Sequence, residues 1–299
     1  MTTSTEQRCG LVAIVGRANV GKSTLLNSIL GQKLSITSRK PQTTRYQILG
    51  VKTIDNSQLV FVDTPGWQRH PKNELNRMMN RQVRHAMGDV DYAVLVSDAR
   101  YWHADDQIVY EMLSKAELPI VLALNKHDLL KSKSDLLPLI AQLGTDKSFA
   151  EIIPVCARTG AGVADLVQCL SRTMPERAHL YPHDQITDRP ERFFASEIIR
   201  EKTLRFLGDE LPYRTTVLID EFKDEDNVTR ILATIWVERD SQKSIVIGKD
   251  GELLKRISVE ARQDLEQLLD RHVYLRVWVK TRRGWTDSPE AMHPLGLRD

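Results

Sequence analysis

The sequence predicts an α/β protein, in which a doubly wound domain with a mostly parallel sheet precedes a smaller α+β domain. Short apolar runs alternate with helix-like segments from residue 10 to about 174, as in parallel sheets that helices cover on both faces. Residues 175–190 then carry three prolines and little periodicity, which is typical of a linker. Beyond them the pattern changes to a long amphipathic helix followed by alternating strands.

In the first domain, near-continuous apolar runs of strand length indicate burial on both faces. The predicted strands are LVAIV (11–15), YQILGVKTI (46–54), QLVFVD (58–63), DYAVLVSD (91–98), PIVLALNK (119–126) and IIPVCA (152–157). The segments with helical spacing include KSTLLNSIL (22–30), LNRMMNRQVRHAM (75–87) and GVADLVQCL (162–170).

The second domain is predicted to have the order α-β-β-α-α-β. Its segments are a helix over 191–207, strands over 213–222 and 228–239 with KDEDN as the turn, the run SIVIGKDG, a long helix reaching residue 270, and a strand over 272–280. The predicted domain limits are 8–175 for the first domain, 176–190 for the linker, 191–285 for the second domain and 286–299 for a tail.

Composition narrows the class of protein. The chain has 299 residues, a hydrophobic fraction of 41% and a charged fraction of 27%, as in soluble globular proteins. No apolar run approaches the roughly 18 to 20 residues of a membrane span, and the polar N-terminus has no secretion signal. The three cysteines lack metal-ligand spacing, so we expect reduced thiols in a cytoplasmic protein. Residues 181–299 hold 20 basic and 23 acidic residues, so any nucleic-acid site there must be a local patch.

Residues Gly16 to Ser23 match the phosphate-binding loop G-x-x-x-x-G-K-[ST], between an apolar strand and a helix. Glycines let the backbone approach a polyphosphate, the lysine adds a positive charge, and the helix start adds N–H groups. We therefore predict nucleotide contacts from the following residues: Gly16, Arg17, Ala18, Asn19, Val20, Gly21, Lys22, Ser23 and Thr24.

Asp128 in NKHD, at the end of a predicted strand, selects the base in this prediction. A carboxylate there accepts two hydrogen bonds from guanine, whereas adenine offers no such pair of donors. Asn125 and Lys126 would brace the loop and cover the base. The sequence CAR, Cys156 to Arg158, stands where related GTPases have Ser-Ala-x, and the Ala157 N–H would reach the guanine O6.

The motif DTPG, from Asp63 through Thr64 and Pro65 to Gly66, closes another predicted strand. We predict that Asp63 and the Ser23 hydroxyl hold Mg²⁺ and that the Gly66 N–H reports a γ-phosphate. The polar loop 31–44 ends in two threonines, of which Thr44 is favoured to contact Mg²⁺, with Thr43 as the alternative. Lys22, Thr44 and Gly66 are the predicted catalytic residues.

Trp67 stands where many small GTPases carry the glutamine that orients the attacking water. An apolar side chain cannot do this, so we expect slow hydrolysis of GTP to GDP and phosphate without an activator. Packing of Trp67 in the core is the structural alternative, and both can hold.

In the second domain, Gly248-Lys249-Asp250-Gly251 lies between the apolar Ile247 and a helix. This pattern fits the G-x-x-G loop with which KH domains clamp single-stranded RNA. Lys249, Lys255 and Arg256 add positive charge beside it; a tight turn opening a structural helix is the alternative. The stripe Leu253, Leu254, Ile257, Ala261, Leu265 and Leu268 is expected in the core.

The last strand and the residues after it interleave basic and aromatic side chains, which suits stacking on unpaired bases. These residues are Arg276, Trp278, Lys280, Arg282, Arg283 and Trp285, and the prediction places Arg282 and Arg283 among the RNA ligands. The alternative is strand packing followed by a solvated tail.

Together these motifs resemble the bacterial Era family, in which a P-loop GTPase domain precedes a type II KH domain. The resemblance implies a cytoplasmic, Mg²⁺-dependent GTPase that binds small-subunit ribosomal RNA near its 3′ end. It also implies a role in maturation of the small ribosomal subunit and peripheral association with the inner membrane; we expect a monomer. The alternative is a GTPase whose C-terminal domain docks a protein or the membrane surface.

Overall fold

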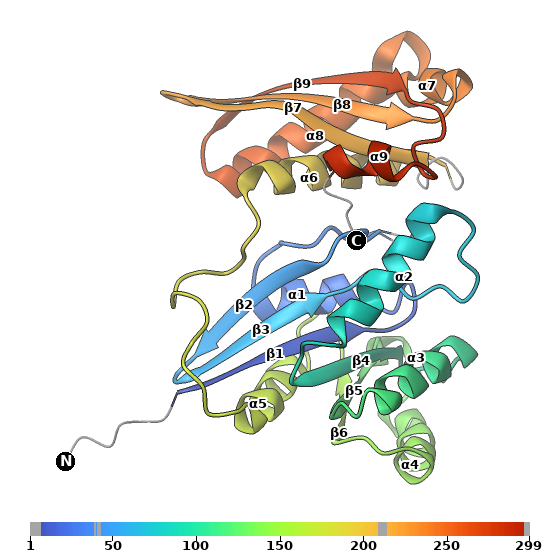
Figure 1. Ribbon diagram of the computed structural model, residues 1–299, viewed down its shortest axis with the longest axis vertical. Coiled ribbons are helices and arrows are strands. Elements are labelled where there is room, and N and C mark those ends of the chain that lie inside the picture. Colours follow the sequence, from blue (N-terminus) through green and yellow to red (C-terminus); the bar gives the residue numbers. More distant parts are fainter. Residues whose placement is uncertain (1–6, 39, 41–42, 209–213, 296–299) are drawn as a thin grey trace, which may run out of the picture. The chain divides into compact units, whose positions relative to one another are not determined.

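The computed structural model describes residues 7–38, 40, 43–208 and 214–295 (Figure 1). It contains two compact units, one of residues 1–35, 44–71 and 76–188 and the other of residues 36–43, 72–75 and 189–299. Residues 39, 41 and 42 of the predicted polar loop, and residues 296–299 of the predicted tail, lie outside the described residues. None of the described helices is long and apolar enough to cross a bilayer.

The first unit is built on a six-stranded sheet with the order β2-β3-β1-β4-β5-β6. Its strands are β1 (Arg8–Val15), β2 (Ile48–Ile54), β3 (Ser57–Asp63), β4 (Tyr92–Asp98), β5 (Ile120–Asn125) and β6 (Glu151–Val155). Only β2 runs antiparallel to its neighbour. The predicted doubly wound, mostly parallel sheet is confirmed, and its strands end where the predicted motifs begin.

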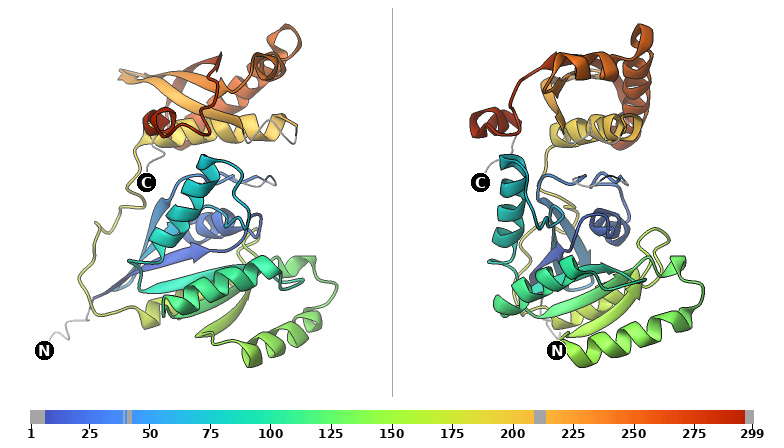
Figure 2. Two further views of the ribbon diagram at one scale, coloured as in Figure 1. Left: turned by 45° about the vertical axis from the view of Figure 1, so that its right-hand side comes forward. Right: turned by 90° about the vertical axis from the view of Figure 1, so that its right-hand side faces the viewer.

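Helices cover both faces of this sheet (Figure 2). The helices of the first unit are α1 (Lys22–Leu30), α2 (Glu74–Ala86), α3 (Ala104–Lys115), α4 (Leu136–Asp146) and α5 (Val163–Thr173). Val83 of α2, Val109 of α3 and Leu143 of α4 are buried in one core with the strand residues Leu95 and Leu122. Helices α1 and α5 contact each other; α1 also contacts β1, β2 and β3, and α5 contacts β3 and β6.

The predicted linker is held against the first unit by a buried side chain. The Gln58 carbonyl oxygen accepts hydrogen bonds of 2.9 Å from the backbone N–H groups of Leu180 and Tyr181, and its amide donates to the Tyr181 carbonyl. The Val51 N–H donates to the Ile186 carbonyl at 2.7 Å. A proline-rich segment with little periodicity is therefore held along the sheet by the Gln58 side chain of β3 and by a backbone bond to the edge strand β2, which no sequence pattern indicates.

The second unit has three strands in the order β7-β8-β9, with β7 antiparallel and β9 parallel to β8. Its elements are α6 (Glu191–Phe206), β7 (Thr215–Glu225), β8 (Val228–Val237), α7 (Asp240–Ile247), a 3-10 turn η4 (Lys249–Gly251), α8 (Glu252–Leu269), β9 (His272–Thr281), α9 (Pro289–Met292) and a 3-10 turn η5 (His293–Leu295). The predicted order α-β-β-α-α-β is confirmed. Strand β7 extends through the first three residues of KDEDN and leaves only residues 226 and 227 as the turn, while β8 begins at Val228 as predicted.

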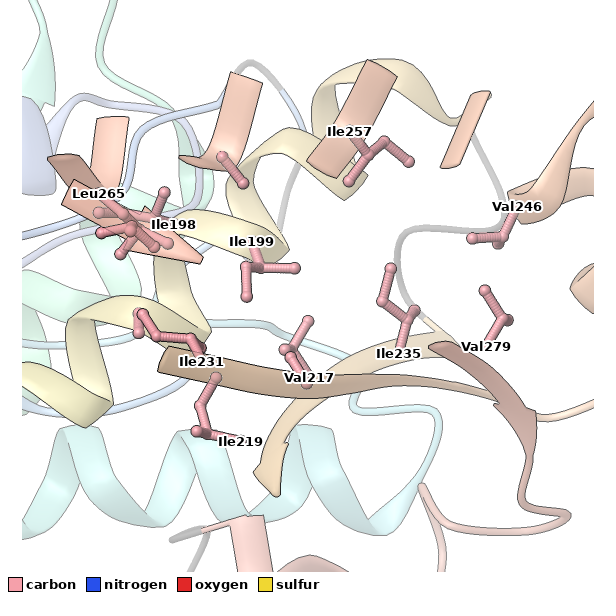
Figure 3. Close-up of a cluster of buried hydrophobic side chains, with 14 of the residues drawn as sticks. Ile198, Ile199, Val217, Ile219, Ile231, Ile235, Val246, Ile257, Leu265 and Val279 are labelled. Atoms are coloured by element: carbon pink, nitrogen blue, oxygen red, sulfur yellow. The ribbon is translucent and has the colours of Figure 1, made fainter. Parts of the chain in front are cut away.

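One face of this sheet packs on the helices. Figure 3 shows Ile199 and Ile257 of the helices on the side to which Val217 and Ile235 of the strands point. Of the predicted core stripe on α8, the three residues Ile257, Ala261 and Leu265 are fully buried. Leu268 is 38% exposed, so that part of the prediction is wrong: it lies on the same side of α8 as the buried residues, but in the last turn of the helix, which ends at Leu269.

Candidate functional site

The phosphate-binding loop leaves β1 at Val15 and enters α1 at Lys22. Gly16 and Gly21 have φ of 149° and 101°, values that favour glycine. A Cβ at Gly16 would lie 2.4 Å from the Val96 carbonyl oxygen, and one at Gly21 would lie 2.3 Å from the Asn125 amide nitrogen. Space as well as backbone conformation therefore requires both glycines.

Lys22 is buried inside this loop. Its Nζ donates to the carbonyl oxygens of Gly16 at 3.1 Å and Arg17 at 3.0 Å. Burial lowers the pKa of Lys22 to about 8, against the opposing effect of the Asp63 carboxylate. Arg17 turns to the side and pairs with Asp106 at 3.3 Å. A buried ammonium group held by carbonyl oxygens is ready to exchange them for phosphate oxygens.

Three oxygen-bearing side chains converge beside Lys22. The Ser23 hydroxyl lies 2.6 Å from the Thr44 hydroxyl and donates to Asp63 Oδ2 at 2.8 Å. Burial raises the pKa of Asp63 to about 6. Thr43, the alternative to Thr44, turns its hydroxyl to the Lys40 carbonyl instead.

This set fits Mg²⁺. In the described part of the chain, Asp63 Oδ1 is buried and has no hydrogen-bond partner. No group of three or more His, Cys, Asp or Glu side chains among the described residues could hold a metal ion. A site made of hydroxyls and one carboxylate therefore needs phosphate oxygens to complete a hard-cation shell.

The DTPG segment lies directly against the phosphate-binding loop. The backbone N–H of Trp67 donates to the Gly16 carbonyl at 3.3 Å. A Cβ at Gly66 would lie 2.8 Å from Ala18 Cα. Trp67 is buried in the core with the Arg84 guanidinium 5.5 Å from its ring centre, as the packing alternative expected. The Thr64 hydroxyl donates back to the Ile14 carbonyl, away from Ser23 and Asp63.

Asn125 ties three loops together at the end of β5. Its amide donates to the Val20 carbonyl at 2.8 Å, and its side-chain oxygen accepts from the Ala157 N–H at 2.9 Å. The Ala157 N–H, which was expected to reach the guanine O6, is thus hydrogen-bonded to Asn125. Lys126 donates to the Asn19 carbonyl at 2.6 Å and pairs with Asp98 at 3.2 Å.

Asp128 lies beside the CAR segment. The Cys156 thiol donates to Asp128 Oδ1 at 3.1 Å, and Arg158 donates to Asp128 Oδ2 at 2.7 Å. The hydrogen bond from Cys156 and that from Arg158 lower the pKa of Asp128, although burial opposes them. The carboxylate is ionised at neutral pH and can accept hydrogen bonds on both oxygens.

Four residues that shape this site belong to none of the predicted motifs: Asn27, Ser35, Asp98 and Asp106. Asn27 fixes the loop after α1 by accepting from the N–H groups of Leu34 and Ser35. The Ser35 hydroxyl, fully buried, donates to Asp63 at 3.1 Å. Burial opposes ionisation of Asp98, but hydrogen bonds from Arg100 and the charge of Lys126 lower its pKa to about 2. Asp106 holds Arg17 of the phosphate-binding loop in the ion pair described above. The signals are weak: Asp98 closes a predicted strand, whereas the others stand in helices and loops.

In the second unit, η4 joins α7 to α8. Gly248, Asp250 and Gly251 all have positive φ. A Cβ at Gly248 would lie 2.7 Å from Leu253 Cβ, whereas nothing lies within 4 Å of a Cβ at Gly251. Lys249 and Asp250 are exposed and Ile247 packs on the core. The loop therefore presents open backbone at Gly251, as a clamp on a sugar-phosphate chain requires.

The other basic residues predicted to bind RNA lie in two places, at the start of α8 and directly after β9. Lys255 is exposed in the first turn of α8, while the Arg256 guanidinium lies over the Phe206 ring at 4.4 Å. Arg282 lies over the Trp236 ring at 4.2 Å, and Arg283 approaches Asp240 at 3.7 Å. Trp285, predicted to stack on bases, is fully buried and donates its indole N–H to the Arg214 carbonyl. That prediction is wrong, because packing in the second unit takes the ring.

Comparisons with known proteins agree with these two sites. A family model described as a 50S ribosome-binding GTPase matches residues 11–126, and one described as a KH domain matches residues 210–286. GTPase Era of Ectopseudomonas mendocina (strain ymp) is 51% identical over 299 residues, covering all of both chains. The chain belongs to the Era family of GTPases. GTPase Era of Haemophilus influenzae (strain PittGG) is 50% identical over 97% of both chains.

Two solved Era structures also match. A point variant of Aquifex aeolicus Era bound to GDP·AlF4⁻ has a TM-score of 0.95 and 38% identity, covering 98% of this chain and 100% of that chain. A structure of Era with MgGDPNP and nucleotides 1506–1542 of 16S ribosomal RNA has the same TM-score, identity and coverage. Family membership makes the first unit a GTPase domain, and the predicted fold of a P-loop GTPase domain followed by a KH domain is confirmed.

Proposed function

We propose that this GTPase binds small-subunit ribosomal RNA near its 3′ end and assists maturation of the small ribosomal subunit. The observation that carries the proposal is a nucleotide site and an open G-x-x-G loop in one chain. The Era structure with nucleotides 1506–1542 of 16S ribosomal RNA supports this choice of RNA. The proposed domain limits are those predicted above, with RNA contacts in residues 191–285.

Residues of the first unit have assigned parts in the proposed hydrolysis. Lys22 exchanges its loop carbonyls for phosphate oxygens and offsets their charge. Ser23, Thr44 and Asp63 would hold Mg²⁺, which when bound stabilises negative charge on the phosphates. The Gly66 N–H reports the γ-phosphate, and Asp128 reads guanine. Because Trp67 is apolar and packed in the core, no side chain at that position orients water.

The proposed consequence is slow turnover without an activator. We expect the purified protein to hydrolyse GTP well below about 1 s⁻¹, in the range of GTPases that await a partner. Single-turnover hydrolysis, alone and with small ribosomal subunits, tests this. Turnover above that rate without any partner would contradict it.

Nucleotide state and RNA affinity are coupled in this proposal, because segments 36–43 and 72–75 belong to the second unit. Within that unit the Thr37 N–H donates to Glu201 at 2.9 Å, and the Leu75 N–H donates to the Thr286 carbonyl at 3.0 Å. Thr43 precedes Thr44 of the nucleotide site directly. Coupling must be reciprocal, so equal RNA affinity with GDP and with a non-hydrolysable GTP analogue would remove it.

We further infer a monomer in the cytoplasm with peripheral contact to the inner membrane, on the strength of the family resemblance. Sedimentation of the purified protein and fractionation of cells test these two points.

The RNA assignment is tested by crosslinking the protein to RNA in cells and sequencing the attached fragments. The matched variant carries Gly248→Asp and Gly251→Asp and keeps Lys249 and Asp250. We expect reads at the 3′ end of the small-subunit RNA that vanish in the variant. The same diffuse background from both proteins would instead favour a protein or membrane partner for the second unit.

A further inference from the structure

The three-stranded sheet of the second unit has one face turned away from α6 and α8, and side chains alternate between the two faces. On β9, Val273, Leu275, Val277 and Val279 belong to or pack on the core. The residues between them point to the other face, which we call the outer sheet face. They are Tyr274, Arg276, Trp278 and Lys280, and Arg282 follows at the same spacing.

Strand β8 continues this outer sheet face. The parallel register sets Arg230 beside Tyr274, Thr234 beside Trp278 and Trp236 beside Lys280. The intervening β8 residues, including Ile231 and Ile235, are in the core. Cations and aromatic rings therefore line this face along β9 and β8. Figure 1 shows these two strands, and β9 is an edge strand of the sheet.

The cations lie on the rings. Arg276 is 5.0 Å from the ring centre of Trp278, and Arg282 is 4.2 Å from that of Trp236. A guanidinium held on an indole loses less conformational freedom when it binds an anion. It also covers the ring: Trp236 is only 8% exposed, so its indole is closed to a stacking base.

Charge pairing divides the face. Arg230 is paired with Glu221 at 3.3 Å. Arg276, Lys280 and Arg282 form no ion pair with any carboxylate in the part of the chain that the structure describes. Arg276 and Lys280 are exposed. Three unpaired cations in one row stand out in a region with more acidic than basic residues.

We propose that the outer sheet face binds the RNA phosphate backbone, as a second contact surface besides the G-x-x-G loop. Alternate residues of a strand lie about 6.6 Å apart, so Lys280 and Arg282 are spaced for neighbouring phosphates. Arg276 lies about 13 Å before Lys280, where a phosphate further along the same strand could reach it. A G-x-x-G loop clamps only about four nucleotides, which leaves adjoining RNA for this surface. Phosphates complement unpaired guanidinium and ammonium groups. Insertion into a bilayer would instead favour freely exposed apolar rings, but Trp236 is buried under Arg282, and the exposed ring of Tyr274 carries a hydroxyl. The inference rests on the proposed RNA-binding function.

The test uses the full chain carrying Arg276→Gln and Lys280→Gln. Affinity for an RNA of nucleotides 1506–1542 of 16S ribosomal RNA is measured across a salt series. Each lost phosphate contact reduces the magnitude of the slope of log affinity against log salt by about 1. The slope of the double variant should therefore be smaller by about 2, and the variant should bind roughly tenfold more weakly at low salt. The matched control Arg230→Gln, on the same face but paired with Glu221, should keep the wild-type slope.

Two further measurements separate the possible failures. If Gly248→Asp with Gly251→Asp leaves RNA binding intact, the proposed KH function fails, whatever the sheet variant does. If that loop variant loses binding and the sheet variant keeps the full salt slope, the outer sheet face is not an RNA surface. Loss of binding to anionic phosphatidylglycerol vesicles by the sheet variant, with an unchanged RNA slope, would assign the face to lipid and overturn the proposal. Thermal unfolding verifies that each variant is folded.

Discussion

The Arg158 guanidinium lies 2.7 Å from Asp128 Oδ2, so the carboxylate that should read guanine already holds a cation. The Cys156 thiol occupies the other oxygen at 3.1 Å. The Arg158 side chain is 76% exposed and that of Asp128 is 22% exposed. Such an exposed pair is weak, so a base that donates to the same carboxylate can displace it.

Replacing Asp128 by Asn should change the preferred base. An amide donates where guanine also donates, but it matches the carbonyl that xanthine has at that edge. We expect GTP affinity to fall by ~10²-fold or more and XTP affinity to rise above that of the wild type. Competition binding with the two nucleotides measures this, and unchanged GTP affinity would remove the assignment.

Replacing Arg158 by Ala should tighten binding of GTP and GDP alike. The variant frees Asp128 Oδ2 for the base, and an exposed ion pair is worth about 0.2–1 kcal/mol, so a gain of roughly two- to fivefold is expected. Arg172→Ala, at a position in the last turn of α5, is the control. Weaker binding of both nucleotides would mean that Arg158 holds the base instead of competing with it.

The raised pKa of Asp63 predicts that this carboxylate lowers the stability of the fold while it serves the Mg²⁺ site. Because its pKa in the fold is raised from 3.8 to about 6, the folded protein binds more protons than the unfolded chain between these pH values. The free energy of unfolding therefore falls as pH rises from about 4 to 6. Asp63→Asn removes this loss, so the variant should be the more stable protein above pH 6, by at most ~3 kcal/mol.

The same substitution should abolish Mg²⁺-dependent hydrolysis, because an amide cannot supply the charge of Asp63 to a cation. Thermal unfolding of both proteins without nucleotide, from pH 4 to 7, measures the stability effect. A melting-temperature difference that does not grow across this range would show that Asp63 is not the group responsible.

The sequence predicted the parts of the site that lie at strand ends and in glycine-rich turns. The loop 16–23, Asp63 and Asn125 follow apolar runs in a parallel sheet, so their convergence at one edge follows from topology. Ser35 could not be found this way, because a loop serine reaches Asp63 only through the fold around Asn27. The outer sheet face required the register of β8 against β9, which alternation within one strand does not give.

Gly66 should tolerate no side chain. A Cβ there would lie 2.8 Å from Ala18 Cα, a backbone atom of the phosphate-binding loop that cannot move aside cheaply. Gly66→Ala should therefore displace DTPG from the loop and lower GTP hydrolysis by about tenfold or more, since misplaced groups cost about this much. GDP affinity should change little, because GDP has no γ-phosphate to report. Equal loss of GDP and GTP affinity would indicate general damage to the loop.

Variants of Trp285 test whether its ring only packs in the second unit or also stacks on an RNA base. The ring is fully buried and its N–H donates to the Arg214 carbonyl at 3.1 Å. Trp285→Ala should cost about 3–5 kcal/mol of stability, as for other buried aromatic residues. Trp285→Phe keeps most of the packing but leaves the Arg214 carbonyl without its donor, so it should cost about 1–3 kcal/mol. Denaturant unfolding and RNA affinity are measured on the same preparations. If the ring only packs, the folded fraction of either variant binds RNA as the wild type does. Weaker RNA binding by the folded fraction would show that Trp285 also contributes to the RNA site.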